Sequence, residues 1–167
     1  SFFQVNTSAA QILARTALDL LPEGGEELLD LYCGVGAPGL LLAPAFSRLY
    51  GVEQDARAVA LARENAAGLS VDHCRYAAGD AALLLQERTA TADMVLADPP
   101  RAGLAPAALA ALLRLRPRSI LYISCNPATL ARDAALLREG YRLARLAAVD
   151  LFPHTPHVEC LSLWQRL

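Results

Sequence analysis

The stretch DLYCGVGAPG, residues 30–39, decides the fold because it joins a buried strand to a glycine loop. The residue pattern predicts the strand over residues 27–32, the loop over residues 33–39 and a helix over residues 40–45. Gly34, Gly36 and Gly39 follow the spacing Gly-x-Gly-x-x-Gly, which gives a ligand unhindered access to backbone amides. This unit predicts an α/β fold with a ligand crevice at the carboxyl ends of its strands.

Strands and helices alternate on both sides of this unit. Upstream, Ser8 and Gln11 match a capping box for a helix that ends at the break over residues 22–25. Downstream, the pattern predicts helices over residues 55–67, 81–88, 106–115 and about 126–140, and strands over residues 48–52, 71–77, 93–97, 119–124, 141–149 and 157–165. We therefore expect a doubly wound, mostly parallel Rossmann-like sheet, with an antiparallel edge where the last two strands follow each other directly.

Composition limits the class of protein. The chain has 167 residues, of which 54% are hydrophobic, so we expect one folded domain rather than a disordered chain. No apolar run reaches the roughly 18 residues that a bilayer span needs. All fifteen cations are arginine and the net charge is −2, which argues against binding nucleic acid by bulk electrostatics alone. The chain opens at Ser1 without Met or a signal peptide, so we expect a piece of a longer cytoplasmic protein.

The cysteines and histidines give no clear metal site. Four cysteines occur without a CxxC pair, a pattern that favours free thiols in the cytoplasm over a zinc or iron–sulfur site: Cys33, Cys74, Cys125 and Cys160. His154, His157 and Glu159 cluster in the segment between the last two strands. Their spacing leaves open a metal site, a catalytic carboxylate or simple solvent exposure.

Acidic residues near the glycine loop bear on the cofactor. Glu53 follows the second strand of the sheet, where a carboxylate can accept hydrogen bonds from a ribose diol of either NAD or S-adenosylmethionine. Asp30 precedes the loop, where it would repel a pyrophosphate but suit the cationic amino-acid end of S-adenosylmethionine. Asp80 could accept from an adenine amino group or cap the next helix. These residues favour the methyl donor over the dinucleotide.

Two further strand ends carry reactive side chains. Asp98 precedes Pro99 and Pro100, and we expect the prolines to hold the carboxylate and the backbone carbonyls of this loop toward the ligand. Cys125 lies directly ahead of a helix that Asn126 caps. We expect the helix N-terminus to stabilise a thiolate there, which makes Cys125 a candidate nucleophile.

These segments together resemble one known family. The likeness to the RNA uridine-C5 methyltransferases, which act on tRNA and rRNA, spans essentially the whole chain. It is carried by residues 3–6 (FQVN), 30–36 (DLYCGVG), 98–103 (DPPRAG), 124–133 (SCNPATLARD) and 157–159 (HVE), in that order.

The resemblance implies a role for each matching residue. Cys125 would add to carbon 6 of uracil, and Glu159 would remove the carbon 5 proton after methyl transfer. Four positions match residues that hold S-adenosylmethionine in the family: Gln4, Tyr32, Glu53 and Asp98. Arg132 is a candidate for stabilising the enolate oxygen, against the alternative of an exposed arginine. The family also implies a class I methyltransferase domain over residues 1–167, an rRNA or tRNA substrate, no metal, and a monomer.

Two departures from the family pattern matter. Ala37 stands where some members have Asn, so a cofactor contact is lost or replaced. The N-terminal RNA-binding domain and central domain of full-length members are absent from these 167 residues, so we expect S-adenosylmethionine binding but weak RNA methylation. Two alternatives stay open: an NAD-dependent dehydrogenase on the same fold and a noncatalytic RNA-binding remnant.

Overall fold

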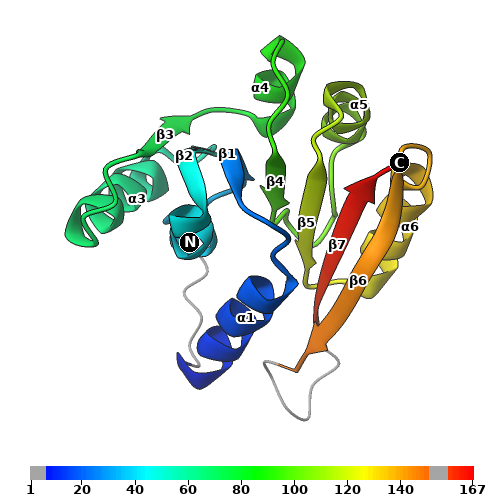
Figure 1. Ribbon diagram of the computed structural model, residues 1–167, viewed down its shortest axis with the longest axis horizontal. Coiled ribbons are helices and arrows are strands. Elements are labelled where there is room, and N and C mark those ends of the chain that lie inside the picture. Colours follow the sequence, from blue (N-terminus) through cyan, green and yellow to red (C-terminus); the bar gives the residue numbers. More distant parts are fainter. Residues whose placement is uncertain (1–6, 151–157) are drawn as a thin grey trace.

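Seven strands form one sheet in this computed structural model, which describes residues 7–150 and 158–167 (Figure 1). The strands are β1 (Gly25–Leu31), β2 (Phe46–Glu53), β3 (Cys74–Ala78), β4 (Met94–Ala97), β5 (Ser119–Ser124), β6 (Tyr141–Val149) and β7 (Glu159–Arg166). Their order is β3-β2-β1-β4-β5-β7-β6. The first five run parallel, and β7 runs antiparallel to both β5 and β6. The predicted doubly wound fold with an antiparallel edge is confirmed.

Helices cover both faces of the sheet. They are α1 (Thr7–Leu20), α2 (Ala37–Leu42), α3 (Ala56–Gly68), α4 (Ala81–Glu87), α5 (Pro106–Leu115) and α6 (Pro127–Leu137), with a 3-10 turn η1 (Ala43–Ala45). One core cluster joins the sheet to α1, α2 and α3, and the other joins it to α4, α5 and α6. Every residue of β4 and β5 is buried, as two-sided coverage of central strands requires. Among the described helices, none combines the length and apolar character needed to cross a membrane.

Local sequence signals set several helix starts as predicted. Asp55 accepts a hydrogen bond from the Arg57 amide at the start of α3, and Asn126 accepts one from the Ala128 amide at the start of α6. The bounds of α5, β5 and β6 match the predicted ranges. Of these elements, α5 begins with Pro106 in its first turn and β5 is buried throughout.

Other predicted bounds were wrong by a few residues. The first helix begins at Thr7, so Ser8 lies inside it rather than at its N-cap. The helix after the glycine loop begins at Ala37 rather than residue 40, because Pro38 is well tolerated in a first turn. Tyr32 lies outside β1, since its φ of 63° ends the strand. The predicted third strand begins at Cys74 rather than residue 71.

The closing hairpin inserts the last strand next to the edge strand of the sheet. β7 lies between β5 and β6 in Figure 1, with Ser124 paired to Cys160 and Ser119 paired to Gln165. The start of β7 therefore lies at the same edge as the carboxyl ends of the parallel strands. That edge is where the predicted site residues meet.

Candidate functional site

The glycine loop connects β1 to α2 at the carboxyl edge of the sheet. Gly34 and Gly36 have φ angles of 53° and 83°, a left-handed conformation that favours glycine. A Cβ atom added at Gly34 would meet nothing within 4 Å, so open space adjoins the backbone there. Both oxygens of Glu53 face the loop region, accepting hydrogen bonds of 3.1 Å from the amides of Gly34 and Asp55. The loop thus presents a fixed carboxylate beside an accessible backbone.

Asp30 is a buried carboxylate beneath this loop. It is 1% exposed, and neither oxygen has a hydrogen-bond partner among the described residues. Burial raises its pKa well above the usual value, and the negative charges of Asp98 and Glu53 raise it further. The Gly39 amide favours the charged form but lies outside hydrogen-bond geometry. Three carboxylates at one crevice suit a cationic ligand and disfavour a pyrophosphate, so the residues present fit S-adenosylmethionine.

Asp98 occupies the end of β4 in the same crevice. Its side chain keeps contact with solvent but has protein on most sides, and this desolvation, with the charge of Glu159, raises its pKa to about 7. The loop turns back at once, because the Gly103 amide donates to the Pro100 carbonyl at 2.8 Å. Asp98 therefore directly precedes a tight turn, and its pKa lies near neutral pH.

Cys125 and Glu159 meet across the β5–β7 pair. Since Ser124 pairs with Cys160 in antiparallel register, Cys125 and Glu159 are the next two residues at that edge. Cys125 is half-buried, and burial is the main reason that its pKa is raised. Glu159 raises the thiol pKa further and Asp98 does so weakly, whereas Arg101 lowers it. The thiol therefore interacts electrostatically with Glu159, Asp98 and Arg101.

The expected stabilisation of a thiolate by the helix stays a prediction. Burial and the charges of Glu159 and Asp98 raise the thiol pKa. The helix N-terminus is also already capped, because Asn126 Oδ1 accepts from the Ala128 amide and Pro127 has no amide hydrogen. Sequence reasoning placed the thiol correctly but missed Arg101, the one cation whose charge favours the thiolate.

Glu159 is the part of the histidine-rich segment that the structure describes. Burial raises its pKa, and it belongs to β7 rather than to the preceding loop. His154 and His157 lie outside the described residues, as does Gln4. Within residues 7–150 and 158–167, no group of three histidine, cysteine or acidic side chains is arranged to hold a metal ion.

Asp80 and Tyr32 lie at the rim beyond Glu53. Asp80 caps α4 by accepting from the amides of Ala82 and Leu83, and its second oxygen accepts from Gln54 Nε2 at 2.9 Å. The capping alternative is thus realised, and a contact with adenine stays a prediction. Tyr32 is half-buried, and its pKa is raised by burial and by the charges of Asp80 and Asp133.

Sequence reasoning missed a buried network that fastens α6 to the Asp98 loop. Asp133 is 1% exposed; its Oδ2 accepts from the Leu104 amide and from the Tyr122 hydroxyl, both at 2.8 Å. Its Oδ1 accepts from Arg132 Nε and Nη2 at 2.8 and 2.6 Å. Arg132 Nη2 also donates to the Ala102 carbonyl at 2.9 Å. The suggested role of Arg132 at an enolate oxygen is not favoured, since its guanidinium is already engaged in this network.

The start of α6 adds two contacts to the same loop. Thr129 Oγ1 and Asn126 Nδ2 donate to the Arg101 carbonyl at 3.2 and 3.4 Å. The carbonyls of Arg101 and Ala102 therefore face α6, and the expected orientation of Asp98 toward a ligand stays a prediction. We call Asn126, Thr129, Arg132 and Asp133 the α6 clamp. It connects the helix that begins beside Cys125 to the loop that carries Asp98 and Arg101.

Comparison with known proteins gives a consistent result. Residues 1–167 match the family model described as tRNA (Uracil-5-)-methyltransferase. The chain is 47% identical over 175 residues to the 23S rRNA (uracil(1939)-C(5))-methyltransferase RlmD of Acidithiobacillus ferrooxidans, covering 99% of this chain and 39% of that protein. It is 42% identical to an uncharacterized RNA methyltransferase of Nitratidesulfovibrio vulgaris, covering 98% and 36%. The chain thus spans about two fifths of the length of these curated relatives.

Solved structures share the fold. The tRNA (uracil-54, C5)-methyltransferase of Pyrococcus abyssi, in complex with S-adenosyl-L-homocysteine, superposes with a TM-score of 0.86 at 38% identity, over 98% of this chain and 40% of that chain. The N-methyltransferase NodS of Bradyrhizobium japonicum superposes with a TM-score of 0.80 at 18% identity, over 97% and 89%, a likeness of fold alone.

Proposed function

Because the chain belongs to the tRNA (Uracil-5-)-methyltransferase family, we propose that it transfers a methyl group from S-adenosylmethionine to carbon 5 of a uridine in structured rRNA or tRNA. Residues 1–167 would form the catalytic domain of this enzyme. The observation that carries the proposal is the position of Cys125 and Glu159, which adjoin the paired residues Ser124 and Cys160 at the edge where the acidic crevice opens, with the charge of Glu159 acting on the thiol.

Residues around the glycine loop would hold the methyl donor. Glu53 would accept from the ribose diol, the backbone at Gly34 and Gly36 would approach the ligand closely, and Asp98 would face its cationic end. When bound, the donor supplies an electrophilic methyl group on a sulfonium. The proposal extends to Tyr32, Asp80 and Gln4, of which Gln4 lies outside the described residues. The acidity of the crevice disfavours the dinucleotide of the dehydrogenase alternative.

Cys125 and Glu159 would divide the chemistry on uracil. The Cys125 thiolate forms a bond to carbon 6, and the electron pair of the 5,6 double bond moves into an enolate. Carbon 5 of that enolate is nucleophilic and takes the methyl group. Glu159 then accepts the carbon 5 proton, the carbon–sulfur bond breaks, and the double bond and thiolate are restored. The target base must leave its stack to reach this edge.

The electrostatics of the crevice suit these roles. A raised pKa makes Glu159 a stronger base once it is ionised. Asp98, with a pKa of about 7, would be charged beside the bound cationic donor, and the donor's positive charge would offset its repulsion of the thiolate. Arg101 favours the thiolate directly. The chain would thus form its nucleophile when substrate and donor complete the crevice.

Substitution of Cys125 tests the proposal. Cys125→Ala in the full chain should abolish methyl transfer to uridine-containing RNA, while Cys160→Ala, a second half-buried thiol in the adjacent strand, should retain most activity. Glu159→Gln should accumulate a covalent protein–RNA adduct, visible as a slow band on a denaturing gel. Methyl transfer by Cys125→Ala would refute the covalent route. If neither the parent protein nor any variant methylates RNA, the alternative of a noncatalytic RNA-binding remnant is favoured.

The proposal also covers the substrate, the oligomeric state and the cellular compartment of the enzyme. The substrate is an RNA that presents an unstacked uridine, and we propose a monomer without a metal. The four cysteines are free thiols in the structure, which supports the cytoplasm as the compartment.

A further inference from the structure

The edge of the sheet opposite the proposed catalytic centre has an arginine-lined hollow. Its volume is about 490 Å³, and it lies where β5 and β6 begin and β7 ends. The lining residues are Pro22, Glu23, Arg118, Ser119, Arg142, Gln165 and Arg166. Nothing in the proposed methyl-transfer chemistry uses them.

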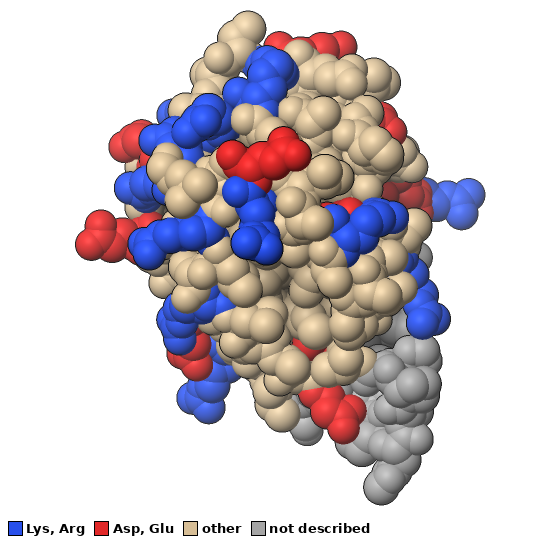
Figure 2. Space-filling view, turned by 90° about the vertical axis from the view of Figure 1, so that its right-hand side faces the viewer, with Lys and Arg blue, Asp and Glu red and all other residues tan. Residues whose placement is uncertain are grey.

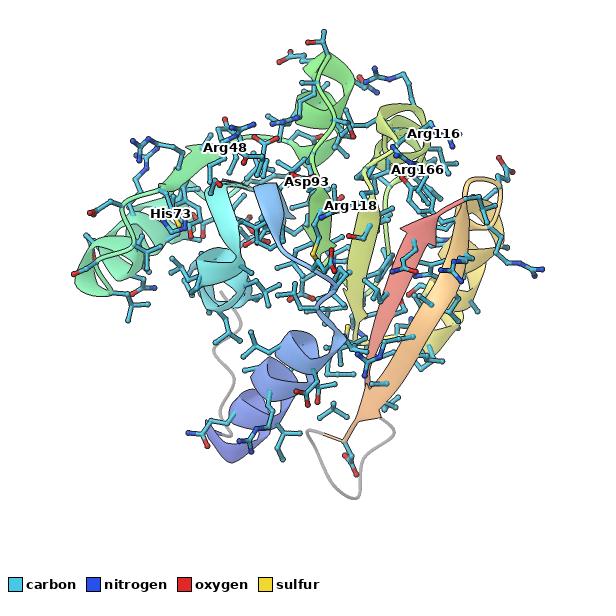
Figure 3. All side chains as sticks on the ribbon, in the orientation of Figure 1. Arg48, His73, Asp93, Arg116, Arg118 and Arg166 are labelled. Carbon is cyan, nitrogen blue, oxygen red and sulfur yellow. The ribbon has the colours of Figure 1, made fainter. Side chains whose placement is uncertain are left out.

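Strand register explains why three of these side chains share one face, whereas Arg166, which pairs with Tyr141, projects to the other face toward the end of α5. Ser119 pairs with Gln165, and Gln165 pairs with Arg142, so one row of three residues crosses β5, β7 and β6 on one face of the sheet. Arg118 and Arg166 flank this row, joined by the 3.0 Å hydrogen bond from the Arg166 amide to the Arg118 carbonyl. Figure 3 shows both labelled side chains at this edge, near the end of α5.

The three arginines are oriented by neutral groups. Arg118 Nη2 donates to the Gly24 carbonyl at 2.7 Å, Arg142 Nη2 to Gln165 Oε1 at 2.8 Å, and Arg166 Nη1 to the Arg116 carbonyl at 2.8 Å. None of the three forms an ion pair with an acid of the described residues. The ion pairs found there use Arg48, Arg88 and Arg132.

The hollow therefore keeps an excess of positive charge. Three arginines face one carboxylate, that of Glu23, although the chain as a whole has a net charge of −2. Figure 2 shows arginines gathered over the upper part of the face that carries β6, toward the same edge. An anion there meets guanidinium groups whose positions are already fixed.

A buried hydroxyl gives a second, independent sign of a ligand. Ser119 is 2% exposed and lines the hollow, and its Oγ has no hydrogen-bond partner among the described residues. A buried hydroxyl without a partner costs free energy that a bound acceptor would recover. Phosphate oxygens accept hydrogen bonds from both guanidinium and hydroxyl groups.

We infer that this hollow binds a backbone phosphate of the RNA substrate, at a site separate from the methyl-transfer crevice. The inference rests on the proposed function for its choice of RNA. β5 has six residues, so its two ends lie about 17 Å apart. At about 3.4 Å per nucleotide of a stacked strand, an RNA that fills both sites extends at least about five nucleotides from the target uridine.

RNA binding by the double variant Arg142→Gln/Arg166→Gln tests the site. In the full chain at 0.15 M salt, a uridine-containing stem-loop of about 20 nucleotides should bind about tenfold more weakly, with a salt slope smaller by about one to two. A trinucleotide centred on the uridine is too short to reach the hollow and should bind unchanged. Ser119→Ala should weaken stem-loop binding in the same direction, about two- to threefold.

Arg75→Gln/Arg138→Gln is the matched control. Arg75 and Arg138 are exposed and do not line the hollow, so their loss removes the same two charges without touching the site. Stem-loop affinity and salt slope of Arg142→Gln/Arg166→Gln equal to those of this control would overturn the inference. Binding is measured without methyl donor, so it decides the site independently of catalysis. If inorganic phosphate at millimolar concentration binds in the hollow and RNA does not displace it, the RNA assignment is wrong.

Discussion

At the scale of a single residue, Asp98 gives the crevice a pH dependence. Its pKa of about 7 means that the carboxyl changes from neutral to charged between about pH 6 and 8. A cationic donor favours the charged form, so binding lowers this pKa and releases a proton. We expect the affinity for S-adenosylmethionine to rise by up to about tenfold over that range, as measured by calorimetry in buffers of different ionisation enthalpy.

The Asp98→Asn variant should lose this rise and bind the donor more weakly at pH 8. Asp55→Asn is a suitable control, because the Asp55 side chain caps α3 by accepting from the Arg57 amide. An Asp98→Asn profile that still climbs between about pH 6 and 8 would assign the titration to another group.

Single-residue properties divide into those that the sequence predicts and those that it does not. Position along the chain predicted that Cys125 follows the fifth strand and that Glu159 belongs to the last one. The direction of the thiol pKa shift was not predictable, because it depends mainly on burial and then on the charge that Glu159 contributes from another strand. The residues next to Cys125 in the sequence indicate only the helix that follows it.

At the scale of elements, we expect substitutions in the α6 clamp to affect the stability of the fold and the rate of methyl transfer to different extents. Arg132→Gln removes the contacts to the Asp98 loop but leaves Asp133 bonded to Leu104 and Tyr122. We expect a loss of about 1–2 kcal/mol in the free energy of unfolding, since Arg132 is half-exposed. We also expect a fall in kcat for methyl transfer of about tenfold and a rise in the KM for the donor, because the loop that carries Asp98 and Arg101 is displaced.

Tyr122→Phe provides the comparison within the same network. It removes one buried hydrogen bond to Asp133 without touching the loop, so it should cost about 1 kcal/mol of stability and leave kcat near that of the parent. Urea unfolding and steady-state methylation on the same preparations separate the two effects. Equal kcat in both variants would mean that the clamp only stabilises the fold.

Element boundaries show which sequence signals were sufficient. α5 and α6 begin with proline in the first turn, and proline at this position indicates a helix start from the sequence alone. The third strand was placed too early because α3 ends in a Schellman turn without glycine at the left-handed position. Ser70 has φ 56°, and the Val71 amide donates to the Ala66 carbonyl at 3.0 Å. The apolar Val71 therefore completes a helix cap instead of starting a strand.

At the scale of the whole molecule, charge is unevenly distributed between the two edges of the sheet. The crevice edge holds Asp30, Glu53 and Asp98, whereas the arginine-lined hollow lies at the opposite edge. With a net charge of −2, the 167-residue chain attracts phosphate weakly near its catalytic centre.

We therefore expect the 167-residue chain alone to bind S-adenosylmethionine but to methylate a short uridine loop at least about tenfold more slowly than a full-length relative such as RlmD. Calorimetry for the donor and radiolabel transfer to the same RNA measure the two properties side by side. Turnover by the chain that matches the full-length relative would show that local charge does not limit RNA capture.

The insertion of β7 between β5 and β6 has a consequence for biosynthesis. Translation delivers Glu159 after every other described strand, so a nascent polypeptide emerging from the ribosome can assemble its parallel half while the base is still missing. Until the final hairpin closes, β5 exposes a bare hydrogen-bonding edge that invites self-association. Closure of this hairpin therefore covers the exposed edge of β5 and brings Glu159 to the edge that holds Cys125 in the same step.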